Sequence, residues 1–232
     1  MKNINIIYFA WINPDPKKNY ASIINGQMDD LLNSGVLDDG TLYIQVCCED
    51  QTLMDTIRDL FNNKLKSIMF HLEIHKQNLF EYYGIKKVYE LAKEEPNKYF
   101  LYFHSKGMFH YGKNIDGRHK YEISLTKGTI CQHKKIIQLF EENPNIMIAG
   151  LFPSNKHKKR FIWMNFYWAR GSYLITCQPP IISTDRYYYE TWLDTGNINL
   201  GLNYNMYENN YNKYDLCQIP CILRTYTGTP TL

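Results

Sequence analysis

Short apolar runs separated by amphipathic stretches are the feature that most constrains the fold of this chain. Tyr99–Phe103 contains only apolar and aromatic residues, and Ile4–Trp11 is nearly as apolar. Strands of this kind are typical of a parallel sheet that is buried on both faces. Apolar residues recur at helical spacing over 23–32 and 78–93, and a further strand is expected at 145–151. This alternation predicts βαβ units and an α/β domain whose central, mostly parallel sheet is flanked by helices.

The length of 232 residues allows one well-filled core, and the sequence has no internal repeat. We expect a single domain over 1–195 and an irregular C-terminal extension, rich in Asn and Tyr, over 196–232 that packs on it. No window approaches the roughly 18 consecutive apolar residues of a membrane span. The first residues also lack the apolar core of a secretory signal, so the expected location is cytoplasmic. The excess of residues with AT-rich codons fits a large DNA virus or a protist-associated microbe. For a viral protein, the expected location is the cytoplasm of the host.

The charge balance argues against nucleic acid as the partner. The net charge is only +3, whereas nucleic-acid binders usually carry a concentrated basic surface. The six cysteines form no zinc-ribbon spacing, and reduced structural thiols are expected. Composition therefore permits an anionic small ligand without requiring one.

His104–Gly107 follows directly on the apolar strand 99–103 and reads His-Ser-Lys-Gly. In open α/β sheets, ligands bind outside the carboxyl ends of the strands. Lys106 offers a positive charge for a phosphate, and Gly107 allows a sharp turn. Taken alone, the segment is better explained as an ordinary strand-to-loop turn with an exposed Lys.

Further along the chain, polar residues stand among aromatic ones. Arg118 and Glu122 are four residues apart, which places both on one face of an expected helix. Asn165 lies within an aromatic strand at 161–170, where a buried amide needs hydrogen-bond partners. Glu190, flanked by Tyr and Trp and preceded by Arg186, is a candidate general base.

The order H-S-K-G, R-x3-E, N-F-Y-W-A-R-x-S-Y-L and R-x3-E-x-W-L resembles a set of glycosyltransferase-like proteins related to the GT-A nucleotide-sugar transferases and, more distantly, to rhamnan-synthesis proteins. The likeness covers about half of the chain, from Asn78 to Leu193. It implies a GT-A-like, Rossmann-like fold, with a nucleotide-binding half at 1–110 and an acceptor half at 111–195. Met164 stands where the resembled pattern has Gly.

The resemblance also implies roles for individual residues. Lys106 and His104 would stabilise the departing diphosphate, and Glu190 would deprotonate the acceptor hydroxyl, which weakly favours inversion at the anomeric carbon. The faces of Trp163 and Trp168 would suit a sugar ring, with core packing as the alternative. The expected substrate-binding residues are Ser105, Gly107, Arg118, Glu122, Trp163, Asn165, Trp168, Arg170 and Arg186, and the expected nucleotide contacts are Phe9, Ala10 and Trp11.

The sequence departs from the GT-A pattern where those enzymes hold a metal. Their Asp-x-Asp motif is replaced here by His104-Ser105-Lys106, and no second acidic residue follows Glu190. A cation about 4 Å from a phosphate charge gains about 4 kcal/mol at an effective dielectric constant of about 20. We therefore favour catalysis without a cofactor, with Mn²⁺ or Mg²⁺ as the alternative. His71, Glu73 and His75 share one strand face, where the simpler interpretation is a wet face and the sharper one a metal site.

The activity predicted on this basis is transfer of a sugar from a UDP-, GDP- or dTDP-sugar donor to a glycan or glycoprotein acceptor. Loss of the Asp-x-Asp motif and of half of the acidic motif at Glu190 also fits a second function. That alternative is a non-catalytic carbohydrate- or nucleotide-binding module on a degenerate transferase fold.

Overall fold

The computed structural model of the protein describes residues 3–12, 20–105, 114–115, 117–154, 161–185, 187–197 and 202–205. Its main sheet contains β1 (Ile4–Ile12), β2 (Gly40–Cys48), β3 (Phe70–His75), β4 (Tyr99–His104), β7 (Ile146–Gly150), β8 (Tyr167–Arg170) and β9 (Leu202–Asn205). These seven strands are arranged in the order β3-β2-β1-β4-β8-β7-β9. A separate two-stranded ribbon pairs β5 (Asn114–Ile115) with β6 (Arg118–His119).

The sheet is mainly parallel. Strands β3, β2, β1 and β4 run parallel to their neighbours, and β7 runs parallel to β9. Only β8 runs antiparallel, to β4 on one side and to β7 on the other. The first four strands therefore end at one common edge, which is the edge where α/β sheets bind ligands.

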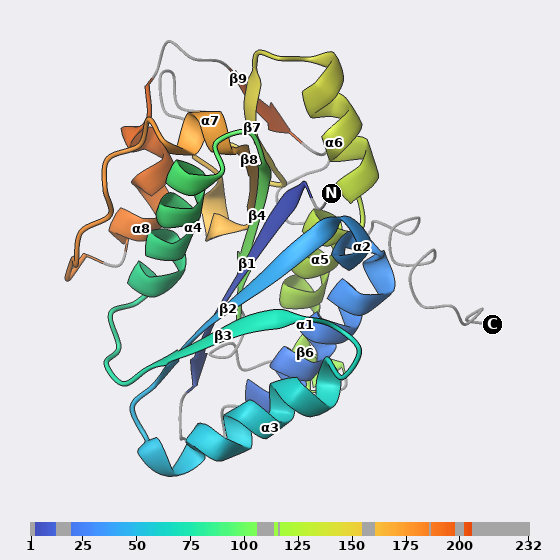
Figure 1. Cartoon of the computed structure of the whole chain (residues 1–232), viewed down its shortest axis with the longest axis vertical. Coiled ribbons are helices and arrows are strands. Elements are labelled where there is room, and N and C mark those ends of the chain that lie inside the picture. Colours follow the sequence, from blue (N-terminus) through green and yellow to red (C-terminus); the bar gives the residue numbers. More distant parts are fainter. Residues whose placement is uncertain are drawn as a thin grey trace.

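Helices cover both faces of the sheet (Figure 1). One face carries α1 (Tyr20–Ser34), α2 (Val36–Asp39), α3 (Met54–Lys64), α5 (Lys120–Ile130) and α6 (His133–Glu142). The other face carries α4 (Tyr82–Glu94), α7 (Gly171–Leu174), α8 (Tyr187–Thr191) and the 3-10 helix η3 (Trp192–Thr195). Two further 3-10 helices, η1 (Gln51–Leu53) and η2 (Trp163–Asn165), occupy connections.

Alternation along β1 explains why the sheet has two cores. Ile6 and Tyr8 pack into the core beneath α1, whereas Ile7 and Phe9 pack into the core beneath α4. All four side chains are buried, because successive side chains of a strand point to opposite faces and both faces are covered. The same holds for β4, whose six residues are all buried.

The structure confirms the expected fold class, a Rossmann-like α/β domain with a mainly parallel sheet. It also differs from expectation in three local features. The strand expected at 161–170 is limited to β8, and Asn165 lies in the 3-10 helix η2, where the left-handed backbone of Met164 and Asn165 interrupts an extended chain. Arg118 lies in β6, just before α5, and not within the helix. Leu202–Asn205 forms β9 at the sheet edge, so part of the C-terminal segment expected to be irregular belongs to the sheet, while 206–232 lies outside the described residues. In the described part of the chain, no helix has the length and apolarity to span a membrane.

Candidate functional site

The carboxyl ends of β1 and β4 lie side by side, because Phe9 pairs with His104 in the parallel ladder. Ser105 continues this pairing: its N–H donates to the Phe9 carbonyl at 3.0 Å, and its Oγ accepts from the Trp11 N–H at 3.2 Å. The side chains of Phe9 and Ala10 are buried in the two cores. Of the three expected nucleotide contacts, only Trp11 therefore has a partly exposed side chain at this edge.

A carboxylate that no sequence motif singled out, Glu81, lies beside His104. Glu81 immediately precedes α4, and its Oε1 lies 3.8 Å from Nε2 of His104. Its Oε2 accepts hydrogen bonds from the Tyr102 hydroxyl at 3.0 Å and from Nδ2 of Asn165 at 2.6 Å. Nε2 of His104 also lies 2.9 Å from the carbonyl oxygen of Met164. The ends of β4 and η2 and the start of α4 thus converge in one polar cluster, Glu81–Tyr102–His104–Asn165.

A close approach of α4 to the sheet positions this cluster. At Gly84, a Cβ atom would lie 2.8 Å from the Tyr102 hydroxyl and 2.9 Å from Cβ of Phe9. Real Cβ atoms essentially never come that close to other heavy atoms, so glycine at this position allows α4 to pack at this depth. The close packing brings Glu81, one turn before Gly84, within hydrogen-bond reach of Tyr102.

Backbone strain is concentrated around the same cluster. Among the described residues, three non-glycine residues have positive φ: Phe80 at 54°, Met164 at 69° and Asn165 at 54°. Each belongs to the cluster or is the chain neighbour of one of its members. Left-handed backbone at bulky residues is rare, and such strain is found mostly at functional sites.

Met164 replaces the glycine of the resembled pattern at one of these strained positions. Its backbone has φ 69° and ψ 1°, which glycine adopts without a steric cost. The turn that it makes directs its own carbonyl toward His104 and the side chain of Asn165 toward Glu81. The glycine of the resembled pattern and the left-handed turn therefore coincide, although this chain carries Met there.

Tyr189, the residue before Glu190, contacts the cluster through its backbone. Nδ2 of Asn165 lies 3.3 Å from the carbonyl of Tyr189, which ties α8 to η2. Glu190 itself is partly exposed. Its charge also contributes to the raised pKa of Tyr121, which burial chiefly raises to about 12. The role of Glu190 as a base stays a prediction.

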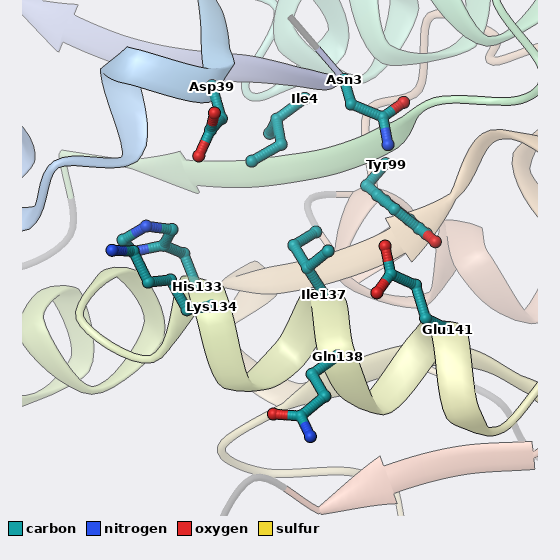
Figure 2. Close-up of a pocket in the computed structure, with 9 residues that line it drawn as sticks. All are labelled: Asn3, Ile4, Asp39, Tyr99, His133, Lys134, Ile137, Gln138 and Glu141. Carbon is teal, nitrogen blue, oxygen red and sulfur yellow. The ribbon is translucent and has the colours of Figure 1, made fainter.

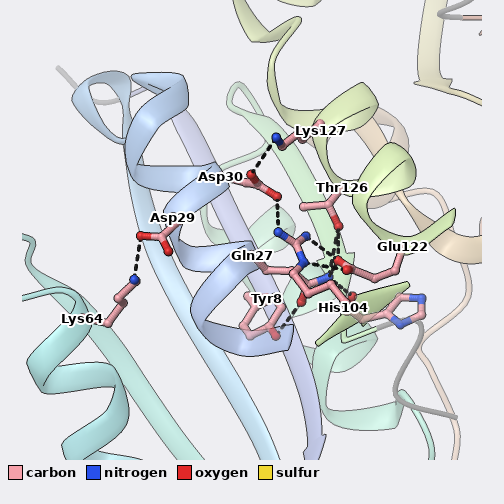
Figure 3. Close-up of polar contacts among 10 residues, drawn as sticks. Tyr8, Gln27, Asp29, Asp30, Lys64, His104, Glu122, Thr126 and Lys127 are labelled. Atoms are coloured by element: carbon pink, nitrogen blue, oxygen red, sulfur yellow. Dashed lines mark hydrogen bonds and ion pairs between the residues drawn. The ribbon is translucent and has the colours of Figure 1, made fainter. Parts of the chain in front are cut away.

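Arg118 and Glu122 form an internal ion pair (Figure 3). Nε and Nη2 of Arg118 each donate to the Glu122 carboxylate at 2.7 Å, and Nη1 donates to Oδ2 of Asp30 at 2.8 Å. Lys127 lies 3.8 Å from Oδ1 of Asp30. Gly26 is required beside this pair, since a Cβ there would lie 2.3 Å from Cδ of Arg118. The described contacts of Arg118 and Glu122, which were both expected to bind substrate, are therefore with other residues of the protein.

Gln27 connects this ion-pair network to the strand ends. Its Nε2 lies 2.8 Å from Glu122 Oε1, 3.1 Å from the Thr126 hydroxyl and 3.0 Å from the His104 carbonyl. Its Oε1 accepts from the Tyr8 hydroxyl at 2.7 Å. The His104 ring points away from this network (Figure 3), so its carbonyl is held from one face of the sheet and its side chain from the other.

Two of the expected substrate-binding residues, Trp168 and Arg170, do not belong to this cluster. Trp168 is fully buried and donates from Nε1 to the Thr129 carbonyl at 2.9 Å, so it packs in the core and cannot present a face to a sugar. Arg170 pairs with Tyr99 at the start of β4 and donates from Nε to the Ile146 carbonyl at 2.8 Å. That position is about 17 Å along the strand from His104, at roughly 3.3 Å per residue.

Trp163 is half-buried and meets Phe161 edge to face, with ring centroids 4.7 Å apart. Three other expected site residues, Lys106, Gly107 and Arg186, lie outside the described residues. Their roles stay predictions. Asp185, which precedes Arg186, caps α8, because its Oδ1 accepts from the Tyr187 N–H at 2.9 Å.

The residues of the possible metal site on β3 have other partners. The ring of His71 stacks on Tyr43, and Glu73 pairs with Lys87 at 2.5 Å. Nε2 of His75 lies 2.8 Å from Oε1 of Gln45. Across the residues that the structure describes, no group of three or more His, Cys, Asp or Glu side chains is arranged to hold a metal ion.

A cavity of about 300 Å³ lies at the opposite, amino end of β1 and β4 (Figure 2). It is lined by Asn3, Ile4, Asp39, Tyr99, His133, Lys134, Ile137, Gln138 and Glu141. His133 is buried, neither of its ring nitrogens makes a hydrogen bond of normal geometry, and burial lowers its pKa. This cavity is separate from the polar cluster around His104.

Comparison with known proteins adds a distant structural likeness. No model of a protein family matches the chain, and no curated protein matches it. Among solved structures, it is similar to the crystal structure of 4-diphosphocytidyl-2C-methyl-D-erythritol synthase, with a TM-score of 0.41 and 10% sequence identity. The likeness covers 96% of this chain and 99% of that one, and it is too distant to assign a function.

Burial of Asp30 makes the stability of the protein depend on pH. Desolvation raises the pKa of Asp30 to about 6, even though Arg118 opposes the shift. The folded state therefore binds a proton between about pH 4 and 6 that the unfolded state releases, so stability falls as pH rises through this range. The difference between the folded and the unfolded pKa of Asp30 corresponds to about 3 kcal/mol. The free energy of unfolding in urea should be measured at pH 4 and pH 7 for wild type and Asp30→Asn. From pH 4 to pH 7, the variant should become more stable relative to wild type by up to about 3 kcal/mol.

The matched control for this prediction is Asp29→Asn, because Asp29 is the exposed neighbour that pairs with Lys64. Exposed pairs contribute little, so its stability relative to wild type should change by well under 1 kcal/mol. A difference between Asp30→Asn and wild type that is flat with pH would contradict the prediction.

The left-handed backbone of Met164 should make glycine better than alanine at this position. Alanine retains the steric cost of φ 69°, whereas glycine does not. We expect Met164→Gly to have a free energy of unfolding about 1 kcal/mol above that of Met164→Ala. Met69, which is exposed and has an ordinary φ, provides the control pair, and there alanine should be at least as stable as glycine. If alanine is at least as stable as glycine at position 164 as well, Met164 is not strained.

Proposed function

We propose that this protein is a glycosyltransferase that moves a sugar from a nucleotide-diphosphate donor to a hydroxyl group of a glycan or glycoprotein. The observation that carries the proposal is the meeting of three distant motif segments at the carboxyl end of β4. His104 ends that strand, Asn165 bonds to Glu81 beside it, and Asn165 also bonds to the residue before Glu190. This is the edge of an α/β sheet where ligands bind.

The proposed reaction is a displacement at the anomeric carbon of the donor sugar. The bond from that carbon to the diphosphate oxygen breaks, and its electron pair stays on the diphosphate. The acceptor oxygen forms the new bond to the anomeric carbon and gives its proton to Glu190. Lys106 and His104 meet the charge that develops on the diphosphate, which is the role that a divalent ion has in the resembled enzymes.

Lys106 is assigned this role on the sequence, because it follows the end of β4 by two residues and stands in the segment that replaces Asp-x-Asp. The proposal rests further on the partial burial of the polar side chains at this edge. The His104 side chain is only 10% exposed and that of Glu81 17% exposed. Charges in such a partly desolvated site interact more strongly than on an open surface.

Incubation with a panel of UDP-, GDP- and dTDP-sugars tests the activity directly. One nucleotide should be released from its sugar conjugate, faster with a suitable glycan acceptor, and EDTA should change the rate little because Lys106 replaces the metal. Nucleotide release can be followed by chromatography, and donor binding by thermal shift. Donor binding without release, across many acceptors, would favour the non-catalytic binding module, and no binding of any donor would refute the proposal.

Substitutions separate the two proposed catalytic roles. Lys106→Ala should lower the rate of nucleotide release about 100- to 1,000-fold, as for the loss of one group that stabilises developing charge. Glu190→Gln should lower turnover to a similar extent yet leave the donor dissociation constant unchanged, because Glu190 acts on the acceptor. Lys134→Ala is the matched control, since Lys134 is exposed at the opposite end of the sheet. Equal rates for Lys106→Ala and Lys134→Ala would contradict the assignment.

A further inference from the structure

Glu81 is a largely buried carboxylate whose two oxygens have different surroundings. Oε2 accepts from both the Tyr102 hydroxyl and the Asn165 amide. Oε1 faces Nε2 of His104 at 3.8 Å. Two neutral donors stabilise the ionised form of a carboxylate, but removal of that charge from water is costly unless an opposite charge lies nearby. The imidazole of His104 is the titratable group that the described contacts place there.

The hydrogen bonds of His104 fix where its proton lies. Nε2 lies 2.9 Å from the Met164 carbonyl, which can only accept, so Nε2 carries a hydrogen. With Nε2 committed in this way, a second proton on Nδ1 makes the ring a cation. Glu81 is within the distance at which an opposite charge favours that form.

The aromatic groups that the structure describes beside the His104 ring are uncharged. Tyr102 and Phe166 pack beside its ring, and burial raises the pKa of Tyr102 well above its ordinary value, so its hydroxyl is neutral. On the other face of the sheet, Gln27 contacts His104 through the backbone carbonyl of His104 and not through its ring. Behind it, the Glu122 carboxylate is matched by Arg118. Lys106, two residues further along, lies outside the described residues.

We propose that Glu81 is a positioning residue that holds His104 in its doubly protonated form and directs it toward the diphosphate of the donor. The inference rests on the proposed function for the identity of that ligand, and on the geometry alone for the pair itself. The strained turn at Met164 and Asn165 supports it, because the same two residues supply the acceptor for His104 and a donor for Glu81. As the donor bond breaks, the imidazolium offers a hydrogen bond to the diphosphate oxygen that receives the electron pair.

The first test measures the protonation of His104 in the free protein by NMR titration of ¹⁵N-labelled histidine, assigned with His104→Gln. If Glu81 acts as proposed, His104 titrates above the ordinary value of about 6.5, although burial alone would lower it. In Glu81→Gln, which keeps the shape of the side chain, the midpoint should fall by about one pH unit or more. Glu90→Gln, on the exposed side of α4, should leave it unchanged.

A wild-type midpoint at or below 6.5, or one that Glu81→Gln does not move, overturns the inference. The wild-type measurement decides the matter even where Glu81→Gln fails to fold. A second measurement follows the dissociation constant of the donor against pH. This constant should rise about tenfold as His104 loses its proton, and in Glu81→Gln the rise should occur at a pH lower by the same amount as the His104 midpoint. If no donor binds, the proposed function fails, and the titration of the free protein still decides whether Glu81 controls His104.

Discussion

β4 is buried on both faces along its whole length, and at its carboxyl end polar side chains from other elements gather around His104. That end is held by two sets of contacts from opposite faces of the sheet. Gln27 binds the His104 carbonyl from the α1 face, while Glu81 and Met164 meet the His104 ring from the other side. A residue fixed at both its backbone and its side chain keeps a defined orientation toward a ligand, which is what a binding or catalytic group requires.

The network behind His104 shows how buried charges can order a site without adding much net stability. Arg118 is shared between Glu122 and Asp30, and Lys127 lies near Asp30 as well. The two hydrogen bonds from Arg118 satisfy the Glu122 carboxylate. At Asp30, desolvation raises the pKa by more than Arg118 and Lys127 lower it. Buried ion pairs often contribute little net stability relative to apolar packing, but removal of one partner leaves the remaining buried charges uncompensated. The value of this network lies in fixing α1 against α5 and both against the end of β4.

The fold could be predicted from the sequence because its determinants are local. Runs such as Tyr99–Phe103 are apolar throughout, which identifies strands buried on both faces before any contact is known. β9 escaped prediction because Leu202–Asn205 has only one aliphatic residue, and its pairing with β7 at the sheet edge comes from the fold. His104, Asn165 and Glu190 stand in separate sequence motifs, and only the folded chain shows that Asn165 contacts both Glu81, beside His104, and the carbonyl of Tyr189.

The roles of individual residues were harder to predict, because the type of a residue does not show whether its side chain faces a ligand or lies in the core. Trp168 and Arg118 fitted a binding site by residue type, but the first is core and the second is paired internally. Glu81 gave no signal, since a glutamate at the start of a helix is most often solvated. Its partners, Tyr102 and Asn165, are 21 and 84 residues away, so only the folded chain brings them together.

The turn at Met164 and Asn165 links local backbone geometry to the arrangement of the whole cluster. Two consecutive left-handed residues reverse the chain just before β8, so that one carbonyl and one amide point at two different elements. An extended backbone would send these groups to opposite sides, because neighbouring residues of a strand alternate. Strain at bulky residues persists only where surrounding contacts overdetermine it. Here the amide of Asn165 meets Glu81 and Tyr189 while its buried Oδ1 has no hydrogen-bond partner among the described residues, so the turn is maintained by contacts on one side of that side chain.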